Sequence, residues 1–399
     1  MPGIREKQTV VTHIISGDLW AGAEAQVYQL ISGLRANREV IPTAVVFNPG
    51  ILYDKLQGLG IEVTVANEAT LSPWRQILTI SDHLKKQNTD IVHTHGFKEN
   101  VLGTLAQHLA RVPRSLRTAH GNPETTLSWK QPAKKLTQIL DDCIARFGQD
   151  AIVAVSRQLE ASLSGKYPRK TVRISNFIDL ESSASAGSRI PSPKTPGSSD
   201  RTPACRIAMI GRAVPVKRID LFIDTIALLR QTHEIDVIGV IYGDGPLLSS
   251  MKEYAALKAP DAIEFKGFVS NVPQELTGAD VLLMPSDHEG LPMSLLEAVS
   301  IGIPVVAHNT GGIPEVLDGG ACGILVTDHS PTGYASAIAG LISDEEFLSA
   351  ISAKARQYVE REFSANQNIR KYQELYERLS SREKVQLTPI ENSTNSDSI

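Results

Sequence analysis

Short apolar runs alternate with longer amphipathic stretches along almost the whole chain, and this alternation restricts the fold more than any other feature. Alternating strands and helices build parallel sheets covered by helices, so we predict an α/β protein. The predicted strands are Val10–Ser16, Pro42–Phe47, Glu62–Val65, Ile91–His93, Ser115–Ala119, Ala151–Ser156, Thr171–Ile174, Arg206–Gly211, Asp236–Tyr242, Ile263–Phe265, Val281–Met284, Val305–Ala307 and Gly323–Val326. The predicted helices span about 22–36, 74–87, 99–111, 132–148, 217–231, 246–258, 292–300, 332–342, 344–361 and 365–379.

A segment rich in Ser, Pro, Gly and Ala, at 181–203, divides the alternation into two halves. Because it has almost no large apolar residue, it cannot offset the entropy of ordering, and we predict a linker. The 399 residues suffice for two domains. We predict two Rossmann-like doubly wound domains that face a cleft, where the carboxyl ends of their strands bind ligands. The predicted parts are an N-terminal domain at 1–180, the linker, a C-terminal domain at 204–362, a helix at 363–380 that can pack on either domain, and a disordered tail at 381–399.

Cysteine usage and the N-terminal sequence lead us to expect a cytoplasmic protein. The three cysteines, Cys143, Cys205 and Cys322, form no CxxC pair, which argues against a disulfide framework or a zinc site. No signal peptide is visible, and the run Val10–Ser16 is too short to span a membrane. No cluster has metal-ligand spacing, so we predict no metal ion and no cofactor.

Charge is distributed unevenly between the halves. Residues 1–180 carry 21 Lys and Arg against 16 Asp and Glu, whereas the remainder carries 19 against 28. This is either ordinary scatter or a sign that the basic half faces an acidic partner such as anionic lipid. The stretch Leu127–Phe147 is amphipathic and basic, and it is either a core-facing surface helix or an element at a membrane surface. No nucleic-acid-binding motif is present.

Two cations follow the first predicted strand of the second half. Arg212 and Lys217 lie five positions apart, where a strand gives way to a helix, and both can reach a diphosphate there. Such charges stabilise a departing phosphate when no metal ion is present. The alternative is a solvated basic turn.

Two carboxylates follow a later strand of the same half. Glu289 begins the run Glu289-Gly290-Leu291-Pro292, and Glu297 comes eight positions later on a predicted helix. Carboxylates accept hydrogen bonds from sugar and ribose hydroxyls, and the N–H groups of Gly290 and Leu291 lie at the start of the helix. A solvated acidic face is the alternative.

Three further positions follow predicted strands. Gly22 begins a helix after the first strand, and Gly243 lies in Tyr242-Gly243-Asp244-Gly245-Pro246, where glycines permit close backbone approach to a ligand. Each of these two signals is weak alone. His120 follows Ser115–Ala119, and we predict an active-site role for it, although an isolated histidine is often only structural.

Taken in order, these segments resemble the retaining glycosyltransferases of family 4, which have the GT-B fold. The resemblance covers nearly the whole chain outside the linker and the tail. In the N-terminal half, Ala21 stands where the family has the first glycine of a Gly-Gly-Ala-Glu loop. The matching segments are Gly22-Ala23-Glu24, Val92-His93-Thr94-His95, Thr118-Ala119-His120-Gly121, Ser175-Asn176-Phe177-Ile178-Asp179, Gly211-Arg212 through Lys217, Gly243-Asp244-Gly245-Pro246, Glu289-Gly290-Leu291-Pro292 through Glu297, Gly302-Ile303-Pro304, and Gly311-Gly312-Ile313-Pro314-Glu315.

The resemblance implies a role for each residue. Arg212 and Lys217 would hold the donor diphosphate, and Glu297 would bind the ribose. Glu289 would hold the transferred sugar with Gly290 and Leu291. Gly22 would line the phosphate side of the cleft, and His120 would lie near the reacting sugar.

The resemblance also implies an activity. We expect a retaining, metal-independent transferase that uses a nucleotide diphosphate sugar, with UDP-sugars favoured. The expected acceptor is a glycan or a lipid-linked molecule of cell-envelope polysaccharide or lipopolysaccharide biosynthesis, reached at the cytoplasmic face of the membrane. Nucleotide-sugar 2-epimerases share the fold and are one alternative; a non-catalytic sugar-nucleotide-binding protein is the other.

Overall fold

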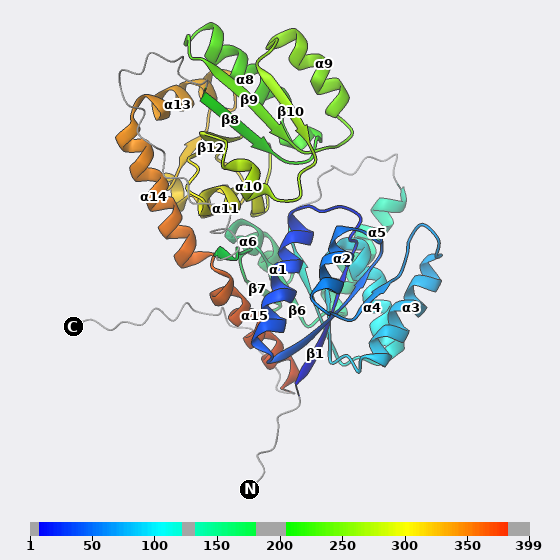
Figure 1. Cartoon of the computed structure of the whole chain (residues 1–399). Helices are drawn as coiled ribbons and strands as arrows, with labels where there is room; N and C mark the ends of the chain where they lie inside the picture. Colours follow the sequence, from blue (N-terminus) through cyan, green and yellow to red (C-terminus); the bar gives the residue numbers. More distant parts are fainter. Residues whose placement is uncertain (1–7, 122–131, 181–204, 382–399) are drawn as a thin grey trace, which may run out of the picture. The chain divides into compact units, whose positions relative to one another are not determined.

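The computed structural model describes residues 8–121, 132–180 and 205–381 (Figure 1). The predicted linker at 181–203, and the predicted tail at 381–399 except for Ser381, lie outside these residues. The structure divides into two compact units, Met1–Asn176 with Ala365–Ile399, and Phe177–Ser364. In the part of the chain that is described, no helix is both long enough and apolar enough to cross a bilayer.

The N-terminal unit contains a seven-stranded parallel sheet of order β3-β2-β1-β4-β5-β6-β7. Parallel strands need crossover connections, and helices provide most of them here. The strands are β1 (Thr9–Ile15), β2 (Val40–Val46), β3 (Val63–Val65), β4 (Ile91–Thr94), β5 (Arg114–Ala119), β6 (Ala151–Ala154) and β7 (Thr171–Arg173). The helices are α1 (Gly22–Asn37), α2 (Ile51–Gly58), α3 (Pro73–Lys86), α4 (Phe97–Ala110), α5 (Pro132–Phe147), α6 (Arg157–Lys166) and α15 (Ala365–Ser380).

The C-terminal unit contains a six-stranded parallel sheet of order β10-β9-β8-β11-β12-β13. Its strands are β8 (Cys205–Ile210), β9 (Val237–Tyr242), β10 (Ile263–Gly267), β11 (Val281–Met284), β12 (Val305–His308) and β13 (Ile324–Val326). Its helices are α8 (Ile219–Gln231), α9 (Leu248–Lys258), α10 (Val272–Leu276), α11 (Met293–Ser300), α12 (Ile313–Val316), α13 (Pro331–Ser343), α14 (Glu345–Glu362) and the 3₁₀ turns η1 (Pro215–Lys217) and η2 (Asp318–Gly320).

The predicted α/β class and all thirteen predicted strands are confirmed. Within the described residues, four helices were not predicted: α2, α6, α10 and α12, which have 8, 10, 5 and 4 residues. Apolar periodicity needs a window of about 11–18 residues, so helices this short give little signal.

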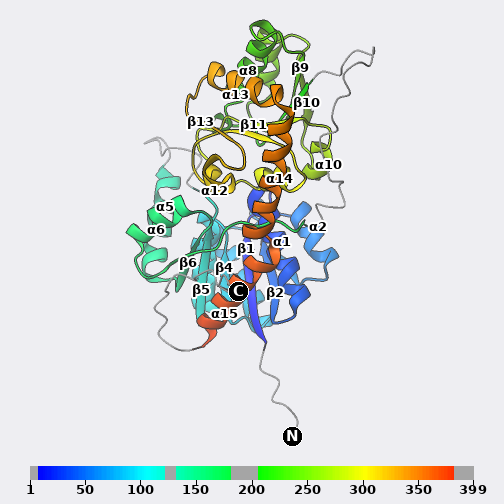
Figure 2. The ribbon, with the colours of Figure 1, turned by 90° about the vertical axis from the view of Figure 1, so that its left-hand side faces the viewer.

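The division of the chain differs from the predicted 1–180 and 204–362. Residues 177–180 belong to the second unit, because Ile178 forms a parallel bridge with Ser364 and its N–H donates to the carbonyl of Phe363 (2.9 Å). The last helix, α15, belongs to the first unit and packs against α1 (Figure 2). Its buried residues recur at helical spacing: Ile369, Tyr372, Gln373, Tyr376 and Leu379.

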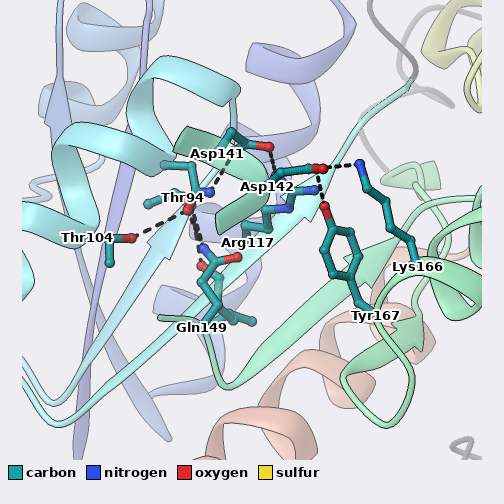
Figure 3. A network of polar contacts seen from close by, with 10 residues as sticks. Thr94, Thr104, Arg117, Asp141, Asp142, Gln149, Lys166 and Tyr167 are labelled. Carbon is teal, nitrogen blue, oxygen red and sulfur yellow. Dashed lines mark hydrogen bonds and ion pairs between the residues drawn. The ribbon is translucent and has the colours of Figure 1, made fainter. Parts of the chain in front are cut away.

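A buried polar network fixes α5 to the N-terminal sheet (Figure 3). Arg117 of β5 pairs with Asp141 of α5, and the two side chains are only 8% and 3% exposed. Asn100 of α4 donates a hydrogen bond to the same carboxylate (2.7 Å). Next to it, Asp142 receives hydrogen bonds from Lys166 and Tyr167. This network determines where the exposed face of α5 lies.

We predict that Arg117→Met destabilises the protein by about 3–5 kcal/mol, because it leaves the carboxylate of Asp141 buried without its cation. The measurement is urea-induced unfolding followed by circular dichroism. Lys166→Met is the matched control: its ion pair with Asp142 is exposed, and its loss costs at most about 1 kcal/mol. Equal shifts for the two variants would contradict this account of the network.

Candidate active site

The loop after β8 carries the two predicted cations. Arg212 is half-buried and directly follows Gly211. Lys217 closes the 3₁₀ turn η1, whereas α8 begins at Ile219, so the predicted helix start at residue 217 is two residues too early. The stem of Lys217 lies over Gly211, where an added Cβ would be 3.2 Å from Lys217 Cε. A glycine at this strand end therefore lets the lysine pack close to the backbone.

Lys217 and Glu289 form an ion pair at the carboxyl end of the sheet. The distance from Lys217 Nζ to Glu289 Oε1 is 2.6 Å, and the side chains are 17% and 9% exposed. A pair this buried is held mainly by its charge-assisted hydrogen bond. An ammonium has three donors, so the bond to Glu289 leaves Lys217 with donors for an anion. The structure thus brings together two of the predicted site residues, one cation and one carboxylate.

The backbone around Glu289 is held by the neighbouring loop after β12. Gly311 has φ 61°, and a Cβ at this position would lie 1.9 Å from the carbonyl oxygen of Glu289. A Cβ on Gly312 would lie 2.0 Å from the oxygen of Gly290. Only glycine fits such contacts. The resemblance includes Gly311 and Gly312, but sequence reasoning gave them no role; here they determine where Glu289 and Gly290 lie.

Further contacts attach the Glu289 loop to the β8 loop. The N–H of Asp287 donates to the carbonyl of Val216 (2.9 Å), and Arg218 Nη1 is 3.1 Å from Asp287 Oδ1. His329 Nε2 lies 3.0 Å from the carbonyl oxygen of Pro285 and donates to it. The ion pair is therefore built on two loops that are themselves bonded together.

Glu297 lies on α11, and Gly290 and Leu291 lie just before that helix. Glu297 is half-buried, and burial of its carboxyl raises its pKa to about 8. Within the described residues, no hydrogen bond joins this carboxyl to Lys217 or Glu289. A carboxyl that is largely protonated at neutral pH can both donate to and accept from a hydroxyl group.

Gly243 lies where the β9 loop crosses the β8 loop. Its φ is 135°, and an added Cβ would lie 1.9 Å from the carbonyl oxygen of Gly211. Close backbone approach was predicted towards a ligand, but in the structure the approaching backbone is that of Gly211. The glycine is thus required for packing of the loops that carry the site.

Gly22 is the exposed first residue of α1 in the N-terminal unit. The N-cap residue, Ala21, has no side chain that can cap the helix. Glu24 lies in the first turn, where burial, with Asp18 and Glu99 nearby, raises the pKa of its carboxyl to about 7. The same carboxyl has backbone hydrogen bonds at Ala21 and Glu24, so the start of the helix carries a carboxyl that is about half protonated at neutral pH.

His120 follows β5 and belongs to a histidine cluster in the N-terminal unit. Its Nε2 is 3.2 Å from Nδ1 of His95, and Nε2 of His95 is 3.1 Å from Nδ1 of His13. His93 lies beside His13 in the sheet register and bonds Thr118 and Tyr376, both at 2.8 Å. Burial lowers the pKa of His120 to about 4, so it is uncharged at neutral pH.

Sequence reasoning missed this cluster because its members come from three separate strands or strand ends: His13 from β1, His93 and His95 from the end of β4, and His120 from the end of β5. The nearest ring nitrogens of His13, His93 and His95 lie within 4.8 Å of one another, a spacing that could hold a metal ion. Spacing along the chain cannot reveal such a group, and only the pairing of β1 with β4 brings it together. However, both nitrogens of His93 already bond hydroxyl groups, which makes them poor ligands.

The chain is similar to known proteins over nearly its full length. A crystal structure of the Anabaena protein HepE in complex with UDP-glucose matches with a TM-score of 0.77 at 18% identity, covering 93% of this chain and 100% of that one. The galactosyltransferase of Escherichia coli named for UDP-Gal and α-D-GlcNAc-diphosphoundecaprenol is 26% identical over 82% of this chain and 84% of its own. N-acetyl-α-D-glucosaminyl L-malate synthase of Bacillus anthracis is 27% identical, over 73% of this chain and 75% of its own length.

The two parallel-sheet units and these similarities define a glycosyltransferase of the GT-B fold. The family described as Glycosyltransferase Family 4 matches residues 20–182, and the family described as Glycosyl transferases group 1 matches residues 200–358. The chain belongs to glycosyltransferase family 4.

We predict that Gly311→Ala lowers donor turnover at least about tenfold. The new methyl group would collide with the backbone of Glu289 and displace the loop that holds the ion pair. Gly340→Ala is the control, because nothing lies within 4 Å of a Cβ at this helical position. Steady-state kinetics of both variants measure the turnover. A rate for Gly311→Ala equal to that of the wild type would contradict the proposed role of the glycine.

Proposed function

We propose that this glycosyltransferase moves a sugar from a UDP-sugar to a hydroxyl of a glycan or lipid-linked acceptor, with retention of configuration and without a metal ion. The observation that carries the proposal is the buried Lys217–Glu289 pair at the carboxyl end of β8 and β11. A cation held there can bind a diphosphate, and the adjacent carboxylate can bind the sugar hydroxyls. The E. coli relative is named for a UDP-sugar donor, and HepE was crystallised with UDP-glucose.

The proposed reaction is a substitution at C1 of the sugar. The bond from C1 to the β-phosphate oxygen breaks, and its electron pair stays on that oxygen. The acceptor oxygen bonds to C1 on the same face, and its proton passes to the departing UDP. Arg212 and Lys217 stabilise the charge that develops on the diphosphate, which replaces the role of a metal ion.

The remaining residues bind and orient the donor and the transferred sugar. Glu289 holds the hydroxyls of the sugar together with the backbone of Gly290 and Leu291, and Glu297 binds the ribose. His120 contacts the sugar. Gly22 gives the diphosphate access to the N–H groups at the start of α1, and Gly243 shapes the loop that carries Arg212; neither glycine acts chemically.

We predict that Lys217→Ala lowers kcat by about 10²–10³-fold, because the charge on the departing diphosphate is then left unstabilised. Steady-state kinetics measure the rate, and circular dichroism checks that the fold is retained. Lys266→Ala is the matched control: this lysine forms an exposed ion pair with Glu264 in the same unit and should keep the full rate. A near-normal rate for Lys217→Ala would refute the role given to this residue.

The same assay tests the two alternatives. A nucleotide-sugar 2-epimerase converts a UDP-sugar when no acceptor is present, whereas a transferase needs the acceptor. A non-catalytic protein binds UDP-sugars, which raises its melting temperature, but turns none over. Product that forms only when acceptor is added supports the transferase.

An exposed apolar face on the N-terminal unit supports a lipid-linked acceptor. On α5, Ile139, Leu140 and Phe147 are exposed, and on the adjacent α4 so are Leu105 and Leu109. Grouped apolar side chains on a surface mark an interaction site more often than scattered ones do. We propose that this face touches the cytoplasmic surface of a membrane where cell-envelope polysaccharide or lipopolysaccharide is made.

We predict that Phe147→Glu weakens binding to phosphatidylglycerol vesicles at least about fivefold in a sedimentation assay. The variant lacks the exposed ring that would insert among the lipid acyl chains, and the anionic surface would repel the new carboxylate. Leu257→Glu is the control, because this leucine of the other unit is equally exposed, at 82%. An equal loss for both variants, or none for Phe147→Glu, would argue against the proposed membrane face.

A further inference from the structure

Three imidazoles form one hydrogen-bonded row in the N-terminal unit. His13 Nδ1 is 3.1 Å from His95 Nε2, and His95 Nδ1 is 3.2 Å from His120 Nε2. His13 and His95 are buried, and His120, which directly follows β5, is half-exposed. Both ends of the row are buried nitrogens without a hydrogen-bond partner among the described residues, Nε2 of His13 and Nδ1 of His120. The row therefore ends at an atom of the histidine for which sequence analysis predicted an active-site role.

The bonds in the row allow only two arrangements of protons. Burial lowers the pKa of His13 to about 3 and that of His120 to about 4, and it also lowers the pKa of His95 well below its usual value. All three rings are thus neutral at pH 7. A neutral imidazole has one N–H and one lone pair, so His95 must donate to one neighbour and accept from the other. The three rings are then all Nδ1–H or all Nε2–H, and a change in one requires a change in the others.

The two arrangements differ in which buried N–H is left without a partner among the described residues. In the Nε2–H arrangement, His13 would have an N–H without an acceptor, and this residue is 0% exposed. A buried N–H without a partner is costly and rarer than an unused lone pair. In the Nδ1–H arrangement, the N–H without a protein partner is that of His120, whose Nδ1 is also buried but whose residue is half-exposed, so a ligand can supply an acceptor at this end of the row and not at the fully buried His13. That atom then needs an acceptor from outside the described residues.

His93 does not compete for these bonds. Its Nδ1 is 2.8 Å from the hydroxyl of Tyr376 and its Nε2 is 2.8 Å from that of Thr118, so both of its nitrogens have partners. Its ring packs 4.1 Å from that of His95, between centroids, and so supports that ring through contact alone. The row of three is therefore independent of the proton on His93.

We propose that His13 and His95 are positioning residues that hold His120 in the Nδ1–H form, so that His120 donates a hydrogen bond to an oxygen of the bound sugar substrate. The identity of that ligand rests on the proposed function, whereas the proton arrangement does not. In this role His120 is a neutral hydrogen-bond donor. His13 and His95 affect the substrate only by fixing which nitrogen of His120 carries the proton. Neither needs to touch the substrate.

The test is ¹⁵N NMR of the full-length protein with labelled histidine at pH 7, which separates Nδ1–H from Nε2–H rings. Single substitutions at each histidine assign the signals. We expect Nδ1–H for all three rings of the wild-type protein. In His13→Phe and in His95→Phe, His120 should become a mixture of the two forms. His108→Gln is the control, because His108 lies on α4 and bonds only the carbonyl of Thr104.

Several results would overturn the proposal. An Nε2–H ring at any of the three positions in the wild-type protein would do so without any variant having to fold. An Nδ1–H form of His120 that persists unchanged in both Phe variants would show that the three rings are not coupled.

Addition of UDP-glucose or UDP-galactose separates this proposal from the proposed function. A raised melting temperature together with a shifted His120 signal supports both. A raised melting temperature with an unchanged His120 signal overturns the contact between His120 and the sugar. No change in melting temperature with either sugar contradicts the UDP-sugar donor, while the proton arrangement is still decided by the spectra without ligand.

Discussion

The C-terminal unit depends on the close crossing of backbones at the carboxyl end of its sheet. Gly243 lies against the carbonyl of Gly211, and Gly311 lies against that of Glu289. These contacts leave no space for a side chain, so the loops after β8, β9, β11 and β12 form one assembly. The Lys217–Glu289 pair is set into this assembly, which explains how two long side chains can keep one geometry while nearly buried. The backbone contacts, rather than the flexible side chains, therefore fix the geometry of the ion pair.

The two units present different chemistry. In the C-terminal unit, opposite charges are paired and the backbone is tightly constrained, as suits the binding of an anion with sugar hydroxyls. In the N-terminal unit, the central feature is a cluster of uncharged imidazoles beside tyrosine hydroxyls, in which hydrogen bonds rather than charges set the geometry.

The sequence was sufficient for features that depend on local pattern, and insufficient for features that depend on pairing. Runs such as Val281–Met284 are apolar from end to end. Strands of a parallel sheet are buried on both faces and have this composition, so the strands were predictable. Glu289 and Lys217 were both named, but their contact joins residues 72 positions apart and depends on two loops. The cluster of His13 and His93 depends on strand register, which the sequence does not reveal. The helix α15 was predicted, but its amphipathic face would suit either sheet, so the unit that it packs on could not be predicted.

The placement of α15 bears on the order in which the chain becomes compact during synthesis. The N-terminal unit includes Ala365–Ser380, so the ribosome must make the whole C-terminal unit before the first unit is complete. Until then the hydroxyls of Tyr372 and Tyr376 are missing from the sheet face that holds His93 and Thr118. A nascent chain stopped before this helix would expose several imidazoles and apolar strands, a surface that chaperones would recognise. The helix that completes the first domain is therefore translated only after the whole of the second unit.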